Sequence, residues 1–384
     1  MAIYEDKTFP EFNLARLLKT VFRPKGGEKV AILIDFEDPK VIEGFSFLDK
    51  PEHKDSPQFF AYEKIYKGLR EGALDELGMV GGDVFAFEET GGSNLDLPDR
   101  AITVSGEEIS LEKDVYPNYD IIMAVTKFSA TAPLTAFCKK YGFRGSTMHG
   151  LNQVIIDSGL AVDYNEVSKE AEKLRVGMSG ADAVEIDYEV AGKKLTLRLE
   201  LGGQDAQKSH GLCNDEPDIA NLPAGEVYFV PTGAEGKFPL KYEDGTIAIM
   251  DISGMRIQGG ELLSGNPETL EEHLSVIKSD PAAGDIGELG FGTQELPVSG
   301  SDIQDEKIFG TLHVATGRSD HLGGDITPDK FEDAKNATHE DILFSPSKTP
   351  EINVPQARLF RAGETHVLIE NFQPKEFLLN LRAG

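Results

Sequence analysis

The chain has 384 residues, 40% of them hydrophobic and 27% charged, and its formal net charge at pH 7 is −28. This length exceeds one ordinary hydrophobic core and suits two domains. The acidic balance argues against nucleic acid and anionic membranes as partners, since no basic patch offsets it. Only two cysteines occur, the N-terminal residues do not resemble a signal peptide, and no segment is apolar enough to span a membrane. We therefore expect a cytoplasmic protein without a disulfide framework.

The first half of the chain alternates strand-like and helix-like segments. Continuous apolar runs predict buried strands at residues 29–35, 84–88 and 119–126. Helical spacing, polar caps and terminal glycines predict helices at 62–78, 129–142 and 165–178. Such alternation favours a parallel sheet with crossover helices, so we predict an N-terminal α/β domain over residues 1–180.

After residue 180 short strands and glycine-rich loops dominate. The stretch 183–203 has the pattern of an antiparallel hairpin, and further strand-like runs continue almost to the end of the chain. One helix is predicted over 266–280. We therefore expect a mostly β (α+β) C-terminal domain over residues 181–384, carrying a metal site for the following reasons.

Three of the eight histidines lie close together, at His313, His321 and His339. Histidine and carboxylate together supply the ligands that zinc or cobalt prefers. Residues i and i+2 of a strand face the same side, so His339 and Asp341 can point at one ion. The H-x-D pattern is common by itself, and the alternative is a solvated loop.

Two glutamates stand in apolar surroundings. Glu226 directly precedes an apolar strand, and Glu288 lies among three glycines and two large apolar residues. A carboxylate in such a setting needs a cation or an exposed strand end. Three carboxylates and two imidazoles suit a pair of divalent ions, which can activate a bound water and polarise a carbonyl. The candidate ligand set is Glu226, Glu288, His313, His339 and Asp341.

The segments NLPAGEVYFVP, GELGFGTQ, GTLHVATG and THEDIL resemble, in that order, the metal-site segments of the M29 metallo-aminopeptidase family, the aminopeptidase T and aminopeptidase S group. The similarity is strongest from Ser129 to Asp341. It implies an N-terminal α/β domain, a C-terminal domain with two metal ions, a homodimer, and release of N-terminal amino acids from short peptides. It also implies the same five ligands, from Glu226 to Asp341.

One position departs from the family. Members have a tyrosine seven residues after the GTLH histidine, where this chain has Asp320 followed by His321. A tyrosine donates a hydrogen bond to a developing oxyanion, whereas an ionised aspartate repels it. Asp320 or His321 could instead bind metal, His321 could act as the donor, or both could lie on a solvated loop.

Three functions remain open from the sequence, and the presence of both Glu226 and Glu288 favours the first. The first is a dinuclear metallo-aminopeptidase in which Glu288 accepts a proton from a metal-bound water, with Asp320 and His321 as further catalytic candidates. The second is a ring-cleaving dioxygenase with one iron, because the family's fold is shared with 2,5-dihydroxypyridine dioxygenases and two histidines with Asp341 can form its site. The third is a paralogue that binds metal or peptide without turnover.

Overall fold

The computed structural model describes residues 4, 7–214 and 216–383. The first half of the chain, together with one short strand from the second half, builds a seven-stranded sheet in which five neighbouring strands are parallel and the two strands at one edge are antiparallel. Its order is β10 (Ile219–Asn221), β6 (Arg144–Thr147), β5 (Ile121–Val125), β1 (Lys29–Phe36), β2 (Val80–Glu88), β3 (Arg100–Thr103) and β4 (Glu108–Ser110).

The second half forms two antiparallel sheets. The five-stranded sheet has the order β17 (His339–Phe344), β16 (Leu312–Gly317), β15 (Ile286–Gly292), β11 (Glu226–Phe229) and β9 (Gln207–Ser209). The eight-stranded sheet has the order β14 (Arg256–Ser264), β13 (Ile247–Ser253), β12 (Gly233–Lys241), β8 (Lys193–Glu200), β7 (Ala183–Val190), β18 (Ile352–Arg361), β19 (Glu364–Glu370) and β20 (Gln373–Pro374). A parallel sheet followed by mostly antiparallel ones confirms the predicted fold class.

Within the described residues, six α-helices of five residues or more accompany these sheets: α1 (Leu14–Phe22), α4 (Thr131–Tyr141), α5 (Gln153–Asp157), α6 (Tyr164–Met178), α7 (Pro267–Ser279) and α9 (Glu376–Ala383). Shorter ones are α2 (Pro57–Phe60), α3 (Leu74–Leu77) and α8 (Asp302–Asp305). The helix that the sequence predicts over 62–78 is irregular, with two π-helical turns and a break at Gly72. Gly72 has a φ of +141°, which a residue with a Cβ rarely adopts. Among the described residues, no helix is long and apolar enough to cross a membrane.

The five-stranded sheet has one apolar face and one polar face. Val227, Leu289 and Val314 point into a core shared with Ile186 and Leu197 of the eight-stranded sheet. Because side chains alternate along a strand, the residues between them point away from that core. The polar face is therefore directed toward the N-terminal α/β half.

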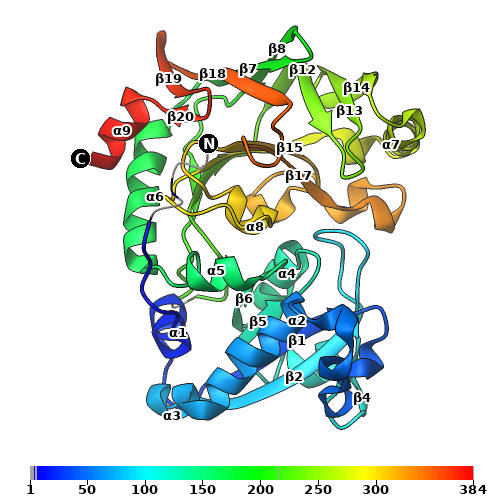
Figure 1. Ribbon diagram of the computed structural model, residues 1–384, viewed down its shortest axis with the longest axis vertical. Coiled ribbons are helices and arrows are strands. Elements are labelled where there is room, and N and C mark those ends of the chain that lie inside the picture. The colour runs from blue at the N-terminus through cyan, green and yellow to red at the C-terminus, as the bar shows by residue number, and fades with distance from the viewer. Residues whose placement is uncertain (1–3, 5–6, 215, 384) are drawn as a thin grey trace.

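The two halves of the chain are stacked along the long axis of the molecule (Figure 1). The parallel sheet lies in the lower half, the eight-stranded sheet in the upper half, and β15 and β17 lie between them. The chain returns once to the lower half after residue 180, because β10 pairs in parallel with β6. The boundary that we predict at residue 180 stays a prediction.

Candidate metal centre

Sheet register brings the five candidate ligands to one face of the five-stranded sheet. Glu226 of β11 pairs with Gly292 of β15, two residues beyond Gly290. Gly290 in turn pairs with His313 of β16. Ala315 of β16 pairs with Glu288 of β15 on one side and with Asp341 of β17 on the other, and Gly317 pairs with His339 of β17. Since alternate residues of a strand share a face, these pairings place all five side chains together.

Gly290 makes room for the cluster. A Cβ at this position would lie 2.2 Å from Cε1 and 2.3 Å from Nε2 of His313, and 2.5 Å from Oε1 of Glu226. The ring and the carboxylate therefore cross directly over the backbone of β15. Gly290, one of the glycines near Glu288 in the sequence, is therefore needed for these side chains to come together.

The ligand atoms of the cluster lie at separations typical of a shared cation. Oε1 of Glu226 lies 3.0 Å from Nε2 of His313. Nε2 of His339 lies 3.0 Å from Oε2 of Glu288 and 3.2 Å from Oδ1 of Asp341. Two atoms that bind one ion at about 2.1 Å and at right angles lie about 3.0 Å apart. Three overlapping groups of donor atoms fit an ion: Glu226, Glu288 and His313; Glu288, His339 and Asp341; and Glu306, His313 and Asp341.

The hydrogen bond on the far side of His339 fixes which ring nitrogen faces the cluster as a ligand. Nδ1 lies 2.5 Å from the backbone carbonyl of Arg318, and a carbonyl can only accept, so Nδ1 carries the proton. In the neutral ring Nε2 is then an acceptor that faces two carboxylates, a contact that requires a cation. Oε1 of Glu226 and Oδ1 of Asp341 are buried and have no hydrogen-bond partner among the described residues. These atoms fit a divalent metal ion.

Without a metal, protons balance the charge. Burial alone would lower the pKa of His313, but Glu226 and Glu288 raise it well above its ordinary value. The pKa of His339 is also raised well above its ordinary value. Burial would lower it, but Asp341 and Glu288 outweigh that effect. Burial would raise the pKa of Glu288, but hydrogen bonds to both histidines bring it well below its ordinary value. A bound metal would displace the two ring protons.

Asp320 and His321 lie at the edge of the cluster. The carboxylate of Asp320 pairs with Arg318, whose Nε lies 2.7 Å from its Oδ1. Burial raises the pKa of Asp320, but His321 and Arg318 more than offset this and lower it. The ring of His321 packs edge-on against His339 with a centroid distance of 4.9 Å, and its Nδ1 has no hydrogen-bond partner among the described residues. His321 therefore faces the cavity, whereas Asp320 faces Arg318.

Two buried residues beside the cluster were not among the sequence candidates. Lys307 places Nζ 2.5 Å from Oε2 of Glu226 and 2.5 Å from Oε1 of Glu306. Lys307 and Glu306 both belong to the run DEK at 305–307, which has the composition of an exposed surface segment. No local pattern distinguishes it from such a segment, because charged residues are seldom fully buried.

His149 approaches the cluster from the N-terminal half. It follows β6 and lines the same cavity as the ligands. Burial lowers the pKa of His149 to about 4, with Asp341 acting in the opposite direction. Its Nδ1 has no hydrogen-bond partner among the described residues. The sequence offers only a lone histidine here, because its neighbours at the site come from distant parts of the chain.

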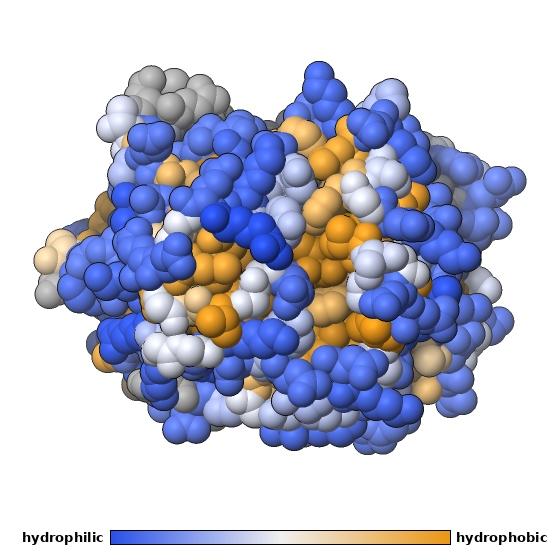
Figure 2. Space-filling view, turned by 90° about the horizontal axis from the view of Figure 1, so that it is seen from below, coloured by the Kyte–Doolittle hydropathy of each residue, from blue (hydrophilic) through white to orange (hydrophobic). Residues whose placement is uncertain are grey.

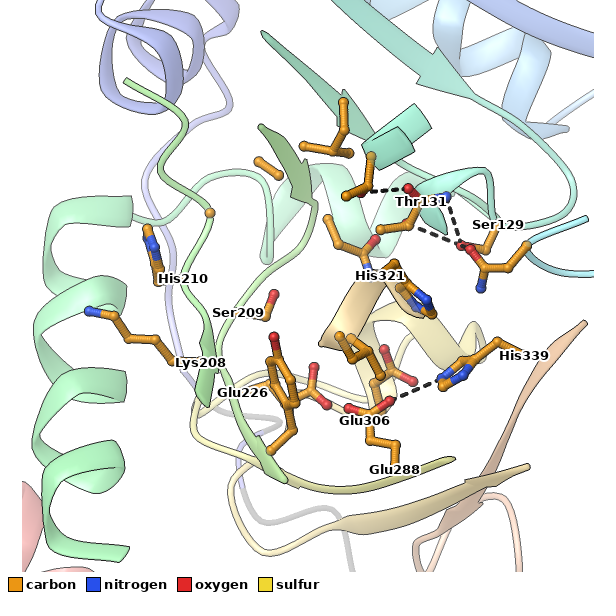
Figure 3. A pocket seen from close by; sticks show the side chains of 18 of the residues that line it. Ser129, Thr131, Lys208, Ser209, His210, Glu226, Glu288, Glu306, His321 and His339 are labelled. Atoms are coloured by element: carbon orange, nitrogen blue, oxygen red, sulfur yellow. Dashed lines mark hydrogen bonds and ion pairs between the residues drawn. The ribbon is translucent and has the colours of Figure 1, made fainter. Parts of the chain in front are cut away.

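The cluster lines a cavity of about 190 Å³ between the two halves. In Figure 3, Glu226, Glu288 and Glu306 gather on one side of it, with His321 and His339 beside them. Ser129 and Thr131, at the start of α4, close the cavity from the parallel sheet, and Lys208 and His210 lie toward α6. A site at the carboxyl ends of parallel strands is where open α/β sheets commonly bind ligands.

Comparison with known proteins gives a likeness of fold. Neither a family model nor a curated protein matches the chain. Among solved structures, the 2,5-dihydroxypyridine dioxygenase from Pseudomonas putida KT2440 aligns with 94% of this chain and 97% of its own, with a TM-score of 0.59 and 15% sequence identity. At this identity the likeness shows a shared fold.

This likeness corrects the expected enzyme class. The sequence favours a dinuclear metallo-aminopeptidase, a hydrolase, but a solved protein that shares the fold along nearly its whole length is a dioxygenase. The site offers a physical reason for the error. Glu226, expected to bind one of two metal ions, is already paired with the ammonium of Lys307. The position of the family tyrosine holds Asp320, which pairs with Arg318. The relation to the M29 family stays a prediction.

Proposed function

We propose that the protein is a metal-dependent dioxygenase that cleaves a hydroxylated aromatic ring, with one iron(II) ion per chain. One observation carries the proposal. Two imidazole nitrogens approach Oδ1 of Asp341, Nε2 of His339 at 3.2 Å and Nε2 of His313 at 3.8 Å, in a fold shared with a 2,5-dihydroxypyridine dioxygenase. Two histidines and one carboxylate are the ligands typical of non-haem iron oxygenases.

The chain supplies the ligands and their orientation. His313, His339 and Asp341 would hold the ion, and Glu288 adds a carboxylate between the two rings. The carbonyl of Arg318 holds His339 in the tautomer that a metal requires. Iron(II), when bound, supplies the redox chemistry that joins dioxygen to the ring.

His149 is placed to orient a substrate hydroxyl. Its lowered pKa, about 4, keeps the ring neutral at physiological pH, so a ring nitrogen can accept a hydrogen bond from that hydroxyl. It faces the ligands across the cavity, and its Nδ1 is free among the described residues. The side chains of Ser129 and Thr131 provide hydroxyl groups on the same side, which can orient a polar ring.

The test is oxygen consumption by the iron-loaded protein. We expect protein loaded with iron(II) without air to consume dioxygen when 2,5-dihydroxypyridine is added, with loss of the absorbance of the ring. His339→Gln and Asp341→Asn should abolish both signals. Glu364→Gln, which changes a side chain that is 76% exposed, should leave them unchanged. Absence of oxygen uptake by protein that retains its iron would refute the proposed activity for this substrate.

A further inference from the structure

The side chain of Lys307 is buried beside the metal centre and fully paired. It follows α8, only 2% of it is exposed, and its ammonium contacts Glu226 and Glu306 at 2.5 Å each. An ammonium group this deep in a protein is costly unless carboxylates compensate it. Both partners are themselves nearly inaccessible, at 6% and 5% exposure, so solvent screens these contacts little. The Lys307 charge is therefore a fixed part of the site.

Lys307 contacts a carboxylate in two of the three groups of donor atoms and none in the third. One group contains Glu226 and another contains Glu306, and both of these carboxylates are bound to the ammonium. The remaining group, Glu288, His339 and Asp341, has no contact with Lys307. The cluster thus has donor atoms for more than one cation, but a positive charge already sits between two of its carboxylates.

We propose that the ammonium of Lys307 takes the place of a second divalent ion and so limits the centre to one metal ion per chain. This inference rests on the proposed function only in taking His339 and Asp341 to hold a metal ion, with the carboxylate of Glu288 beside them. A lysine ammonium neutralises carboxylates as a point charge, but it cannot bind a water or a substrate oxygen as a metal ion does. Lys307 therefore removes the bridging water on which dinuclear hydrolysis depends, while leaving one position at which a metal can bind.

Metal stoichiometry tests this inference directly. Native mass spectrometry and elemental analysis after loading with Mn²⁺ or Zn²⁺ should give one ion per wild-type chain and two per chain in Lys307→Met. Lys307→Arg, which keeps the charge, should bind one. Lys208→Met is the matched control, because Lys208 lines the same cavity but pairs with Glu172, at 3.0 Å, instead of with the cluster. It should also bind one ion. One ion in Lys307→Met overturns the inference.

A titration of the wild type keeps the inference testable if Lys307→Met does not fold. The second equivalent of Zn²⁺ should bind at least about 100-fold more weakly than the first, since it must approach a fixed positive charge. Two equivalents of similar affinity overturn the inference without affecting metal dependence. One tight ion without oxygenase activity supports the inference and contradicts the proposed function. A wild type that binds no metal contradicts both.

Discussion

At the scale of single residues, Gly290 is the position on which the metal centre depends most directly. Its backbone permits an alanine, which would ordinarily favour a strand by about 0.5–1 kcal/mol. The added methyl, however, would overlap the ring of His313 and the carboxylate of Glu226. We therefore expect Gly290→Ala to lower the affinity for Zn²⁺ at least about tenfold, because overpacking costs about 1–3 kcal/mol.

Isothermal titration of the purified variant measures this loss. Gly259→Ala is the matched control, because Gly259 also lies in a strand, β14, and a Cβ there would meet nothing within 4 Å. Its Zn²⁺ affinity should equal that of the wild type. Equal affinities in both variants would show that the ligands do not bind where the cluster places them.

Asp35 predicts how stability depends on pH. Burial raises the pKa of this carboxyl, at the end of β1, to about 6, against an ordinary value of 3.8. Between these two values the folded chain holds a proton that the unfolded chain has lost, so stability falls as pH rises through this window. The difference corresponds to roughly 3 kcal/mol in the free energy of unfolding.

The variant Asp35→Asn isolates this effect. Asparagine keeps the oxygen Oδ1, which accepts from Nε2 of Gln58 at 2.6 Å and from the backbone N–H of Lys127 at 2.9 Å. Its stability relative to the wild type, measured by urea unfolding at pH 4 and pH 7, should therefore increase with pH. A constant difference would indicate that Asp35 has an ordinary pKa in the folded protein.

At the scale of elements, Arg318 joins the connection between β16 and β17 to the N-terminal half. Its Nη1 donates to the carbonyl of Asn94 at 2.9 Å and to Asp96 at 3.1 Å, and its Nε donates to Asp320. The side chain of Arg318 is only 3% exposed, so its loss leaves the buried carbonyl of Asn94 and the partly buried carboxylate of Asp320 without a donor, whereas Asp96 is exposed and stays solvated. Arg318→Met should lower the free energy of unfolding by about 2–4 kcal/mol.

Denaturant unfolding checks this value, and Arg198→Met serves as the comparison. Arg198 also has two carboxylate partners, Glu185 and Glu200, but its side chain is 39% exposed. Its loss should cost less than about 1 kcal/mol. Similar losses in the two variants would mean that the Arg318 contacts do not stabilise the junction of the two halves.

The elements themselves were largely predictable from the sequence. Apolar runs predicted β1, β2 and β5, and the hairpin of β7 and β8 followed from two strand-like stretches around a turn at Ala191–Lys194, which the structure narrows to Ala191 and Gly192. β10 was not predicted, because a three-residue strand has too few side chains to show a period. Its place in the parallel sheet is a long-range pairing that local pattern does not encode.

The metal centre was predictable only in part, because the burial of some of its residues also depends on distant parts of the chain. Glu226, Glu288, His313, His339 and Asp341 stand in glycine-rich or apolar segments, and the structure brings all five together. Lys307 and Glu306 were missed because their burial depends on the fold around them. On the inference drawn above, the number of metal ions depends on one of these residues, Lys307.

At the scale of the whole molecule, the excess of negative charge is the dominant electrostatic feature. The net charge is −28, and side chains that are hydrophilic cover most of the face shown in Figure 2, with apolar areas between them. Many of the ion pairs are exposed, such as Lys169 with Glu166 at 66% and 64%. Pairs of this kind contribute little to stability. Repulsion between the many unpaired carboxylates is therefore not offset by local pairing.

Salt should consequently stabilise the fold. Raising NaCl from about 0.05 M to about 0.5 M shortens the screening length from roughly 14 Å to roughly 4 Å, which weakens long-range repulsion more than contacts at hydrogen-bond distance. We expect the thermal midpoint to rise by at least about 3 °C. The measurement is made by circular dichroism with EDTA present, so that trace metal at the cluster does not contribute. KCl should give the same rise, since screening depends on ionic strength and not on the cation. A midpoint that falls with salt would instead show that the ion pairs outweigh the repulsion.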